Sequence, residues 1–174
     1  YFPIQRPHFW GYSFPLAKEL QLKTKYFDIV HIHSLYLFHS MISGYYCRRY
    51  NIPYLIRPHG TLNPIIYKRH RFRKSIMELL FEKTNFNYAH TIHFSTKDEM
   101  ELASTSKLMQ KSNGTVVPLG LELTEYDNLP TYGKFRLKHP EIGEKKIVLF
   151  FSRINFIKGL DVLASAFLKV SNKI

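Results

Sequence analysis

Two cations near the end of the chain are placed to bind an anion. Arg153 and Lys158 lie in a short loop between the unbroken apolar run 147–151 and a segment after Gly159 whose apolar residues repeat at helical spacing. A strand, a basic loop and a helix in this order put the cations beside a helix N-terminus, where phosphate groups bind in α/β proteins. The sequence therefore predicts a phosphate-binding loop. A plain strand–helix connection with two solvated cations is the other reading.

Histidines end or follow two other apolar segments. His31 and His33 alternate in the predicted strand 28–33, so their side chains would share one face of it. Such a pair can ligate a metal, but no cysteine or clear third ligand is near, and we expect no metal site. His59 follows the predicted strand 54–56 in a tight turn. It either faces a cleft or only bonds the local backbone.

The run 68–74 concentrates positive charge ahead of a predicted helix that has an apolar side. An anionic lipid surface attracts each nearby cation by about 1 kcal/mol, so the run predicts contact with a membrane. A solvated charged face is the equally weighted alternative. The membrane-binding candidates are Lys68, Arg69, Arg71, Arg73 and Lys74.

Strand-like and helix-like segments alternate along the chain, which predicts an α/β fold with a parallel sheet. Ser13 and Thr96 are expected to cap helix N-termini, and Glu99 has capping-box spacing from Thr96. The expected strands are 28–33, 54–56, 91–94, 115–118 and 147–151, and the expected helices after the one capped by Ser13 are 39–50, 72–88, 97–104 and 159–171.

The composition limits the classes of partner. A net charge of +12 over 174 residues favours anionic partners, but no RNA-binding signature, helix-turn-helix or zinc-finger spacing occurs, so we expect no nucleic acid. No apolar run approaches the ~20 residues of a membrane helix. The single Cys47 permits no internal disulfide and indicates a reducing compartment.

Three motifs together resemble the family 4 retaining glycosyltransferases. They are Phe-Ser-Arg-Ile-Asn-Phe-Ile-Lys-Gly-Leu-Asp at 151–161, Pro-His-Gly at 58–60 and Asp-Ile-Val-His-Ile-His at 28–33. The resemblance implies the two-domain GT-B fold. It also implies that Arg153 and Lys158 bind the donor diphosphate and that His59 faces the donor sugar, so these three are the catalytic candidates. His33 and Gly60 become candidate cleft or acceptor residues, and His31 is expected to pack.

The resemblance also implies a domain organisation. Residues 1–121 would form the acceptor-side Rossmann-like domain without its N-terminal strands, 122–146 a polar linker, and 147–174 the first strand and helix of a truncated donor-binding Rossmann-like domain. The family's Gly-rich turn and Glu-x7-Glu segment are not in the sequence. We therefore expect an internal fragment that is inactive alone. Ser152 replaces a frequent Gly, and Leu119 replaces an Asn.

The expected function is transfer of a sugar from a nucleotide-diphosphate sugar to a hydroxyl acceptor. The resemblance implies a glycan or lipid-linked acceptor in cell-surface polysaccharide or glycolipid synthesis, and no metal or other cofactor. It also implies a cytoplasmic protein that is peripheral at the inner face of the cell membrane. Two alternatives remain open. One is another GT-B enzyme, such as a nucleotide-sugar epimerase, and the other is a non-catalytic module that binds anions or lipid.

Overall fold

A computed structural model describes residues 1–171 of the chain. The chain divides into two compact units, Tyr1–Leu121 and a second unit that begins at Glu122. The last three residues of the predicted segment 147–174 lie outside the described residues. Each unit is described here by itself.

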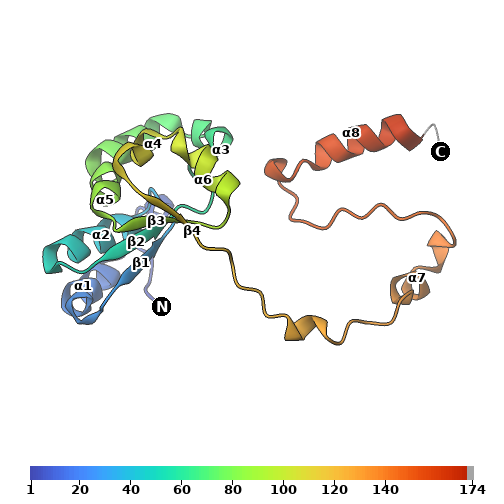
Figure 1. The fold of residues 1–174 in the computed structure, drawn as a ribbon, viewed down its shortest axis with the longest axis horizontal. Coiled ribbons are helices and arrows are strands. Elements are labelled where there is room, and N and C mark those ends of the chain that lie inside the picture. Colours follow the sequence, from blue (N-terminus) through green and yellow to red (C-terminus); the bar gives the residue numbers. More distant parts are fainter. Residues whose placement is uncertain (172–174) are drawn as a thin grey trace. The chain divides into compact units, whose positions relative to one another are not determined.

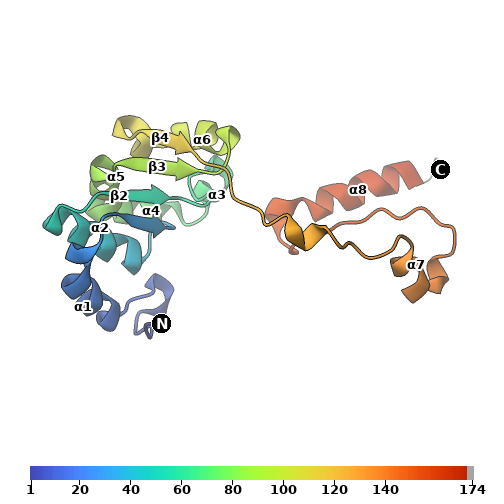
Figure 2. The same ribbon diagram turned by 60° about the horizontal axis from the view of Figure 1, so that its bottom comes forward.

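The first unit is built on a parallel sheet of four strands in the order β1-β2-β3-β4, as Figure 2 shows. Every neighbouring pair is parallel, and the register sets His31 beside Leu55 and His33 beside Arg57. This arrangement confirms the predicted parallel α/β fold and is consistent with a Rossmann-like N-terminal GT-B domain. The strands are β1 Val30–His33, β2 Tyr54–Arg57, β3 Thr91–Phe94 and β4 Gly114–Val116.

The helices of the first unit connect successive strands or lead into the sheet (Figure 1). The α-helices are α1 Phe14–Lys23, α2 Phe38–Tyr50, α3 Pro64–Lys68, α4 Arg71–Met77, α5 Lys83–Tyr88 and α6 Lys97–Ser104. The short 3-10 helices are η1 His8–Trp10, η2 Thr24–Tyr26 and η4 Lys107–Lys111. A π-helical turn, η3 Glu78–Glu82, joins α4 to α5, so the predicted helix 72–88 is observed as one continuous helical segment with a wide turn inside it.

One face of the sheet forms the core. Ile32, Ile56, Ile92 and Phe94 are almost fully buried there, because successive side chains of a strand point to opposite faces. Helices α2, α5 and α6 and turn η4 supply the opposing layer, with core residues Cys47, Phe86, Ala103 and Leu108. The core therefore lies between the sheet and these helices. The other face carries the imidazoles of His31 and His33, with Leu55 beside His31.

The predicted hydroxyl caps at Ser13 and Thr96 are observed, whereas the Glu99 carboxylate accepts from Gly60 and Ser95 and not from Thr96 as a capping box would require. The Ser13 hydroxyl accepts the N–H of Leu16 at the start of α1, and the Thr96 hydroxyl accepts the N–H of Glu99 at the start of α6. Helix α3 was not predicted, although an Asn followed by a Pro is typical of a helix start. The Asn63 side chain accepts the N–H of Ile65 as an N-cap, and Pro64 is tolerated in the first turn because a backbone N–H there would have no partner within the helix.

The prediction of a buried strand at 147–151 is wrong. These residues form no strand, and Leu149 and Phe151 are 73% and 94% exposed. A parallel strand needs a neighbour that accepts and donates its backbone hydrogen bonds, and none of the described strands pairs with this segment. The strand–helix beginning of a second Rossmann-like domain is therefore reduced to its helix, α8 Leu160–Ser171.

The residues predicted as a linker hold short helices. The structure places η5 Thr124–Tyr126, α7 Lys134–Lys138 and η6 Pro140–Ile142 between positions 122 and 146, and η7 Phe156–Lys158 precedes α8. The side chain of Arg136 donates to the backbone carbonyls of Gly143 and Lys145, which ties α7 to the loop after η6.

Candidate functional site

Two histidines meet at the carboxyl ends of β1 and β2. The Nδ1 atom of His33 lies 2.8 Å from the Nε2 atom of His59, and the two rings stack with centroids 5.0 Å apart. One imidazole must donate and the other accept, so at least one ring is neutral. Partial burial lowers the pKa of both rings, and the nearby Arg57 guanidinium lowers it further. The pair therefore favours neutral imidazoles near pH 7.

His31 and His93 extend the pair into a row of four rings. The His31 ring lies 4.3 Å from that of His33 and 5.3 Å from that of His93, between ring centroids. Partial burial, followed by the neighbouring His33 and His93, lowers the pKa of His31 to about 4. His93 anchors the row, because its Nε2 atom lies 2.9 Å from the carbonyl oxygen of Val117. His31, expected only to pack, thus lies between two other imidazoles.

Arg57 brings a buried positive charge to the same strand ends. Arg57 is only 8% exposed, and its Nη2 atom donates to the Ser95 hydroxyl at 2.7 Å. Its Nε atom has no hydrogen-bond partner within residues 1–171. Buried guanidinium groups are normally paired, so this N–H is an unsatisfied donor beneath the strand ends, and the Arg57 charge acts on the histidines through the field it creates.

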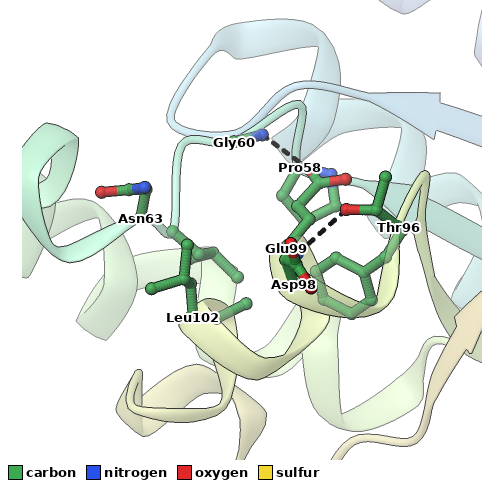
Figure 3. Close-up of a pocket in the computed structure, with 10 residues that line it drawn as sticks. Pro58, Gly60, Asn63, Thr96, Asp98, Glu99 and Leu102 are labelled. Carbon is green, nitrogen blue, oxygen red and sulfur yellow. Dashed lines mark hydrogen bonds between the residues drawn. The ribbon is translucent and has the colours of Figure 1, made fainter. Parts of the chain in front are cut away.

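Glu99 ties the turn after β2 to the turn after β3. One of its carboxylate oxygens accepts the N–H of Gly60 at 2.9 Å (Figure 3). The other accepts the N–H of Ser95 at 2.8 Å. His59 and Gly60 both have positive φ, +54° and +73°, so the carboxylate holds a backbone shape that would otherwise be unfavourable. This bond positions His59 and Gly60 at the strand end.

A small cavity opens beside this turn. It has a volume of about 260 Å³ and lies between the loop that contains Gly60 and the first turns of α6. Figure 3 shows Pro58, Asn63 and Leu102 around it, together with Glu99. The predicted cleft residue Gly60 lines this cavity, whereas His33 and His59 are not among its lining residues.

The loop between β1 and α2 is shaped by a buried carboxylate that the sequence reading missed. Ser34 and Tyr36 have positive φ, and the N–H of Tyr36 donates to Glu82 Oε1 at 2.5 Å. The Ser40 hydroxyl donates to the same oxygen at 2.9 Å. Glu82 has no exposed surface, and burial raises its pKa to about 6. The only sequence signal was a carboxylate directly after the apolar run 79–81.

Replacing Glu82 by glutamine should remove a pH dependence of stability. The pKa of Glu82 is raised in the folded state, so its proton stabilises the fold below about pH 4.5, and this contribution is lost as pH rises through about 6. The change corresponds to about 2 kcal/mol. Urea unfolding at pH 4.5 and pH 7 should show a larger loss of stability for wild type than for Glu82→Gln. Equal losses in both proteins would contradict the assignment.

The two predicted diphosphate-binding cations lie in the second unit. Arg153 stands in an irregular, exposed segment, and Lys158 is the last residue of η7. The Asn155 side chain caps η7 by accepting the N–H of Ile157, and Gly159 has φ +65° directly before α8. The predicted order of basic loop and helix is therefore observed, without the strand in front of it.

The five cations of the run 68–74 do not share one environment. Lys74 donates to the carbonyls of Ile66 and Tyr67, at 2.8 and 3.4 Å, and burial lowers its pKa. Arg73 lies over the ring of Phe9, with 5.4 Å from its guanidinium carbon to the ring centroid. Lys68 and Arg71 line a second cavity, described below. Arg69 is exposed on the turn between α3 and α4.

The described part of the chain shows neither a metal centre nor a membrane span. Between residues 1 and 171, no three or more His, Cys, Asp or Glu side chains are arranged to hold a metal ion, and the histidine row is no exception. No helix in this part combines the length and apolar character needed to cross a membrane.

Comparison with protein families gives one match. A model described as "Glycosyl transferase 4-like domain" matches residues 2–120, which include all four strands and both predicted cleft residues of the first unit. Comparisons with curated proteins and with solved structures gave no match.

Proposed function

Because the chain belongs to the family of glycosyl transferase 4-like domains, we propose that it transfers a sugar from a nucleotide-diphosphate sugar to a hydroxyl group of an acceptor. The family match over residues 2–120 is the observation that carries this proposal. The roles proposed for individual residues are supported by the position of each residue in its unit.

The histidine pair supports a role in holding a sugar. Ligands of open parallel sheets bind at the carboxyl ends of the strands, and His33 and His59 lie at two such ends. A neutral imidazole can accept a hydrogen bond from a sugar hydroxyl or donate one to it. We assign His59 to the donor sugar and His33 to its orientation, since the two rings share a hydrogen bond of 2.8 Å.

The proposed chemistry needs cations where the diphosphate leaves. Negative charge grows on the diphosphate as the glycosidic bond breaks, and fixed cations stabilise that charge more in the transition state than in the ground state. Arg153 and Lys158 are assigned this role because they flank the loop before α8. No metal or other cofactor is required by this scheme.

Glu99, one of the two carboxylates that line the first cavity, has a structural role that does not favour an epimerase. An epimerase of nucleotide sugars would need a carboxylate free to move a proton. Both oxygens of Glu99 accept backbone N–H groups, from Gly60 and Ser95, so this carboxylate holds the two turns together. Sugar transfer is the better supported chemistry because the family match favours it.

The proposal is tested by incubating the full-length protein that contains these 174 residues with a panel of nucleotide-diphosphate sugars and hydroxyl acceptors. Transfer should release the nucleoside diphosphate and add one hexose mass to an acceptor, both measured by mass spectrometry. The His59→Ala variant is measured in the same assay for comparison with wild type. If donors are neither bound nor consumed by the wild-type protein with any acceptor, the proposal fails.

We also propose that the first unit contacts an anionic membrane surface. Phe72 and Leu79 on α4 and η3 are 81% and 80% exposed, and Leu80 beside them is 70% exposed. These apolar side chains share one helical segment with the cations Arg71 and Arg73. Amphipathic helices of this kind bind the lipid interface through apolar burial and charge together.

Replacing the outward cations with glutamine should abolish sedimentation with anionic vesicles. The variant changes Lys68, Arg69, Arg71 and Arg73, and keeps Lys74 because that side chain caps backbone carbonyls. Four cations contribute at most about 4 kcal/mol, less after salt screening. The control changes four exposed lysines elsewhere, Lys18, Lys83, Lys97 and Lys111. If both variants pellet like wild type, the run is only a solvated face.

A further inference from the structure

A second, larger cavity of the first unit lies beside the cations of α3 and α4. Its volume is about 500 Å³, which is within the range of small-molecule sites. Leu62 and Pro64 give it an apolar side, and Leu62 also lines the first cavity near Gly60. The two cavities therefore lie on either side of the same short segment.

The lining of this cavity is positive. Lys68 comes from α3, Arg71 from α4 and Lys107 from η4, so three separate elements each contribute one cation. None of the three forms an ion pair with a described residue. Like charges brought together in this way repel one another, and an anion bound between them would relieve that repulsion.

The one carboxylate in the lining is already engaged. Glu78 accepts hydrogen bonds from the hydroxyls of Tyr36 and Tyr67, at 2.9 and 3.1 Å. Three cations against one carboxylate leave a formal charge of +2 on the lining. Because both carboxylate oxygens have donors inside the unit, Glu78 fixes Tyr36 and Tyr67 and does not neutralise all the cations.

Hydroxyl groups complete the lining. Ser75, Thr105 and Ser106 are within it, and Thr105 donates its hydroxyl proton to the carbonyl of Leu102 at 2.9 Å. Guanidinium and ammonium groups with nearby hydroxyls are the donors that bind phosphate in proteins. A carboxylate ligand carries one negative charge, whereas a phosphate monoester or diphosphate matches a charge of +2.

We propose that this cavity binds a phosphate group of the sugar acceptor, held by Lys68, Arg71 and Lys107. That this ligand is the sugar acceptor rests on the proposed function. That it carries a phosphate group rests on the cavity alone. The apolar side formed by Leu62 and Pro64 would hold the part of the acceptor next to its phosphate. The hydroxyl that receives the sugar would then lie toward the Gly60 turn, because Leu62 lines both cavities.

The test measures binding of hexose 1-phosphate and of inorganic diphosphate to the 174-residue chain by calorimetry. The cavity variant is Lys68→Gln, Arg71→Gln, Lys107→Gln. Its matched control is Arg69→Gln, Arg73→Gln, Lys111→Gln, which removes the same charge from neighbouring positions that do not line the cavity. All measurements are made with Arg153→Gln and Lys158→Gln in place, so that the second unit's cations do not contribute.

We expect the cavity variant to lose at least about tenfold in affinity and the control less than about threefold. The amide resonances of Thr105 and Ser106 should shift with ligand in the parent and control proteins, and in the cavity variant they should shift only at ligand concentrations at least about tenfold higher. Equal losses in both variants, or no binding to the parent protein, would overturn the proposal. Binding is read without sugar transfer, so absence of transfer tests the proposed function separately.

A competition arm identifies the source of the phosphate. Vesicles that contain phosphatidic acid are added to the protein saturated with hexose 1-phosphate. Displacement of hexose 1-phosphate from the control protein is read from the amide resonances of Thr105 and Ser106. Such displacement assigns the cavity to a lipid-linked phosphate. Retention of the sugar phosphate assigns it to a soluble one.

Discussion

In the full-length protein that contains these residues, replacing Arg153 or Lys158 by alanine is expected to lower the turnover of sugar transfer at least about a hundredfold, with the fold unchanged. A unit charge pair at 4 Å contributes about 4 kcal/mol at an effective dielectric of 20, and each factor of ten in rate needs about 1.4 kcal/mol. The loss should appear in kcat, because the charge on the leaving diphosphate develops in the transition state.

The control for this experiment is Lys146→Ala, an exposed cation of the same unit that precedes the apolar run. It should retain nearly full turnover. Circular dichroism of each variant checks that the helix content is preserved. Near-normal turnover of both Arg153→Ala and Lys158→Ala with a nucleotide-sugar donor would remove the assignment of the diphosphate site.

Gly44→Ala is expected to destabilise the first unit by about 2–3 kcal/mol, although alanine is the better helix former by about 1 kcal/mol. Gly44 lies in α2 against α5, and an added Cβ would meet the Asn85 side chain at a distance that atoms cannot share, with Cγ at 2.7 Å. Asn85 would have to move. It accepts from Arg48 at 2.6 Å and donates to the Ser40 carbonyl at 3.1 Å, and it is fully buried.

The matched control is Gly120→Ala, because nothing lies within 4 Å of an added Cβ there and its backbone is not in the left-handed region. Urea unfolding at pH 7 should place this control within about 0.5 kcal/mol of wild type. A stable Gly44→Ala variant would mean that α2 and α5 can separate without cost, and that the Asn85 hydrogen bonds add little to stability.

The strand positions could be predicted because the residues that fill the core are strand formers with a clear alternation. Ile32 and Ile56 alternate with His31, His33 and Leu55, and this period of two fixes which side chains share a face. The sequence predicted His33 and His59 separately as cleft candidates, but not the hydrogen bond between their rings. Caps at Ser13 and Thr96 depend on local geometry alone, and they were predicted correctly.

Contacts between distant segments could not be predicted from one sequence. Glu82 binds the Tyr36 amide 46 positions away, and Glu99 binds the Gly60 amide 39 positions away. Nothing in the local pattern distinguishes such carboxylates from surface ones. The prediction of a strand at 147–151 was wrong for a related reason. An apolar run indicates burial, but whether it becomes a strand depends on neighbouring strands that local sequence does not specify.

The wide turn η3 sets the rotational phase between the two helices that it joins. Each residue of an α-helix advances the direction of its side chain by about 100° around the axis. A π-helical turn accommodates an additional residue without rotating the helices on either side of it, so winding the same residues of Glu78–Glu82 as a regular α-helix would turn α4 by about that angle against α5. Arg71 and Phe72 would then face new directions while Asn85 stayed in place. The length of this one turn therefore decides which surface the cations of α4 present.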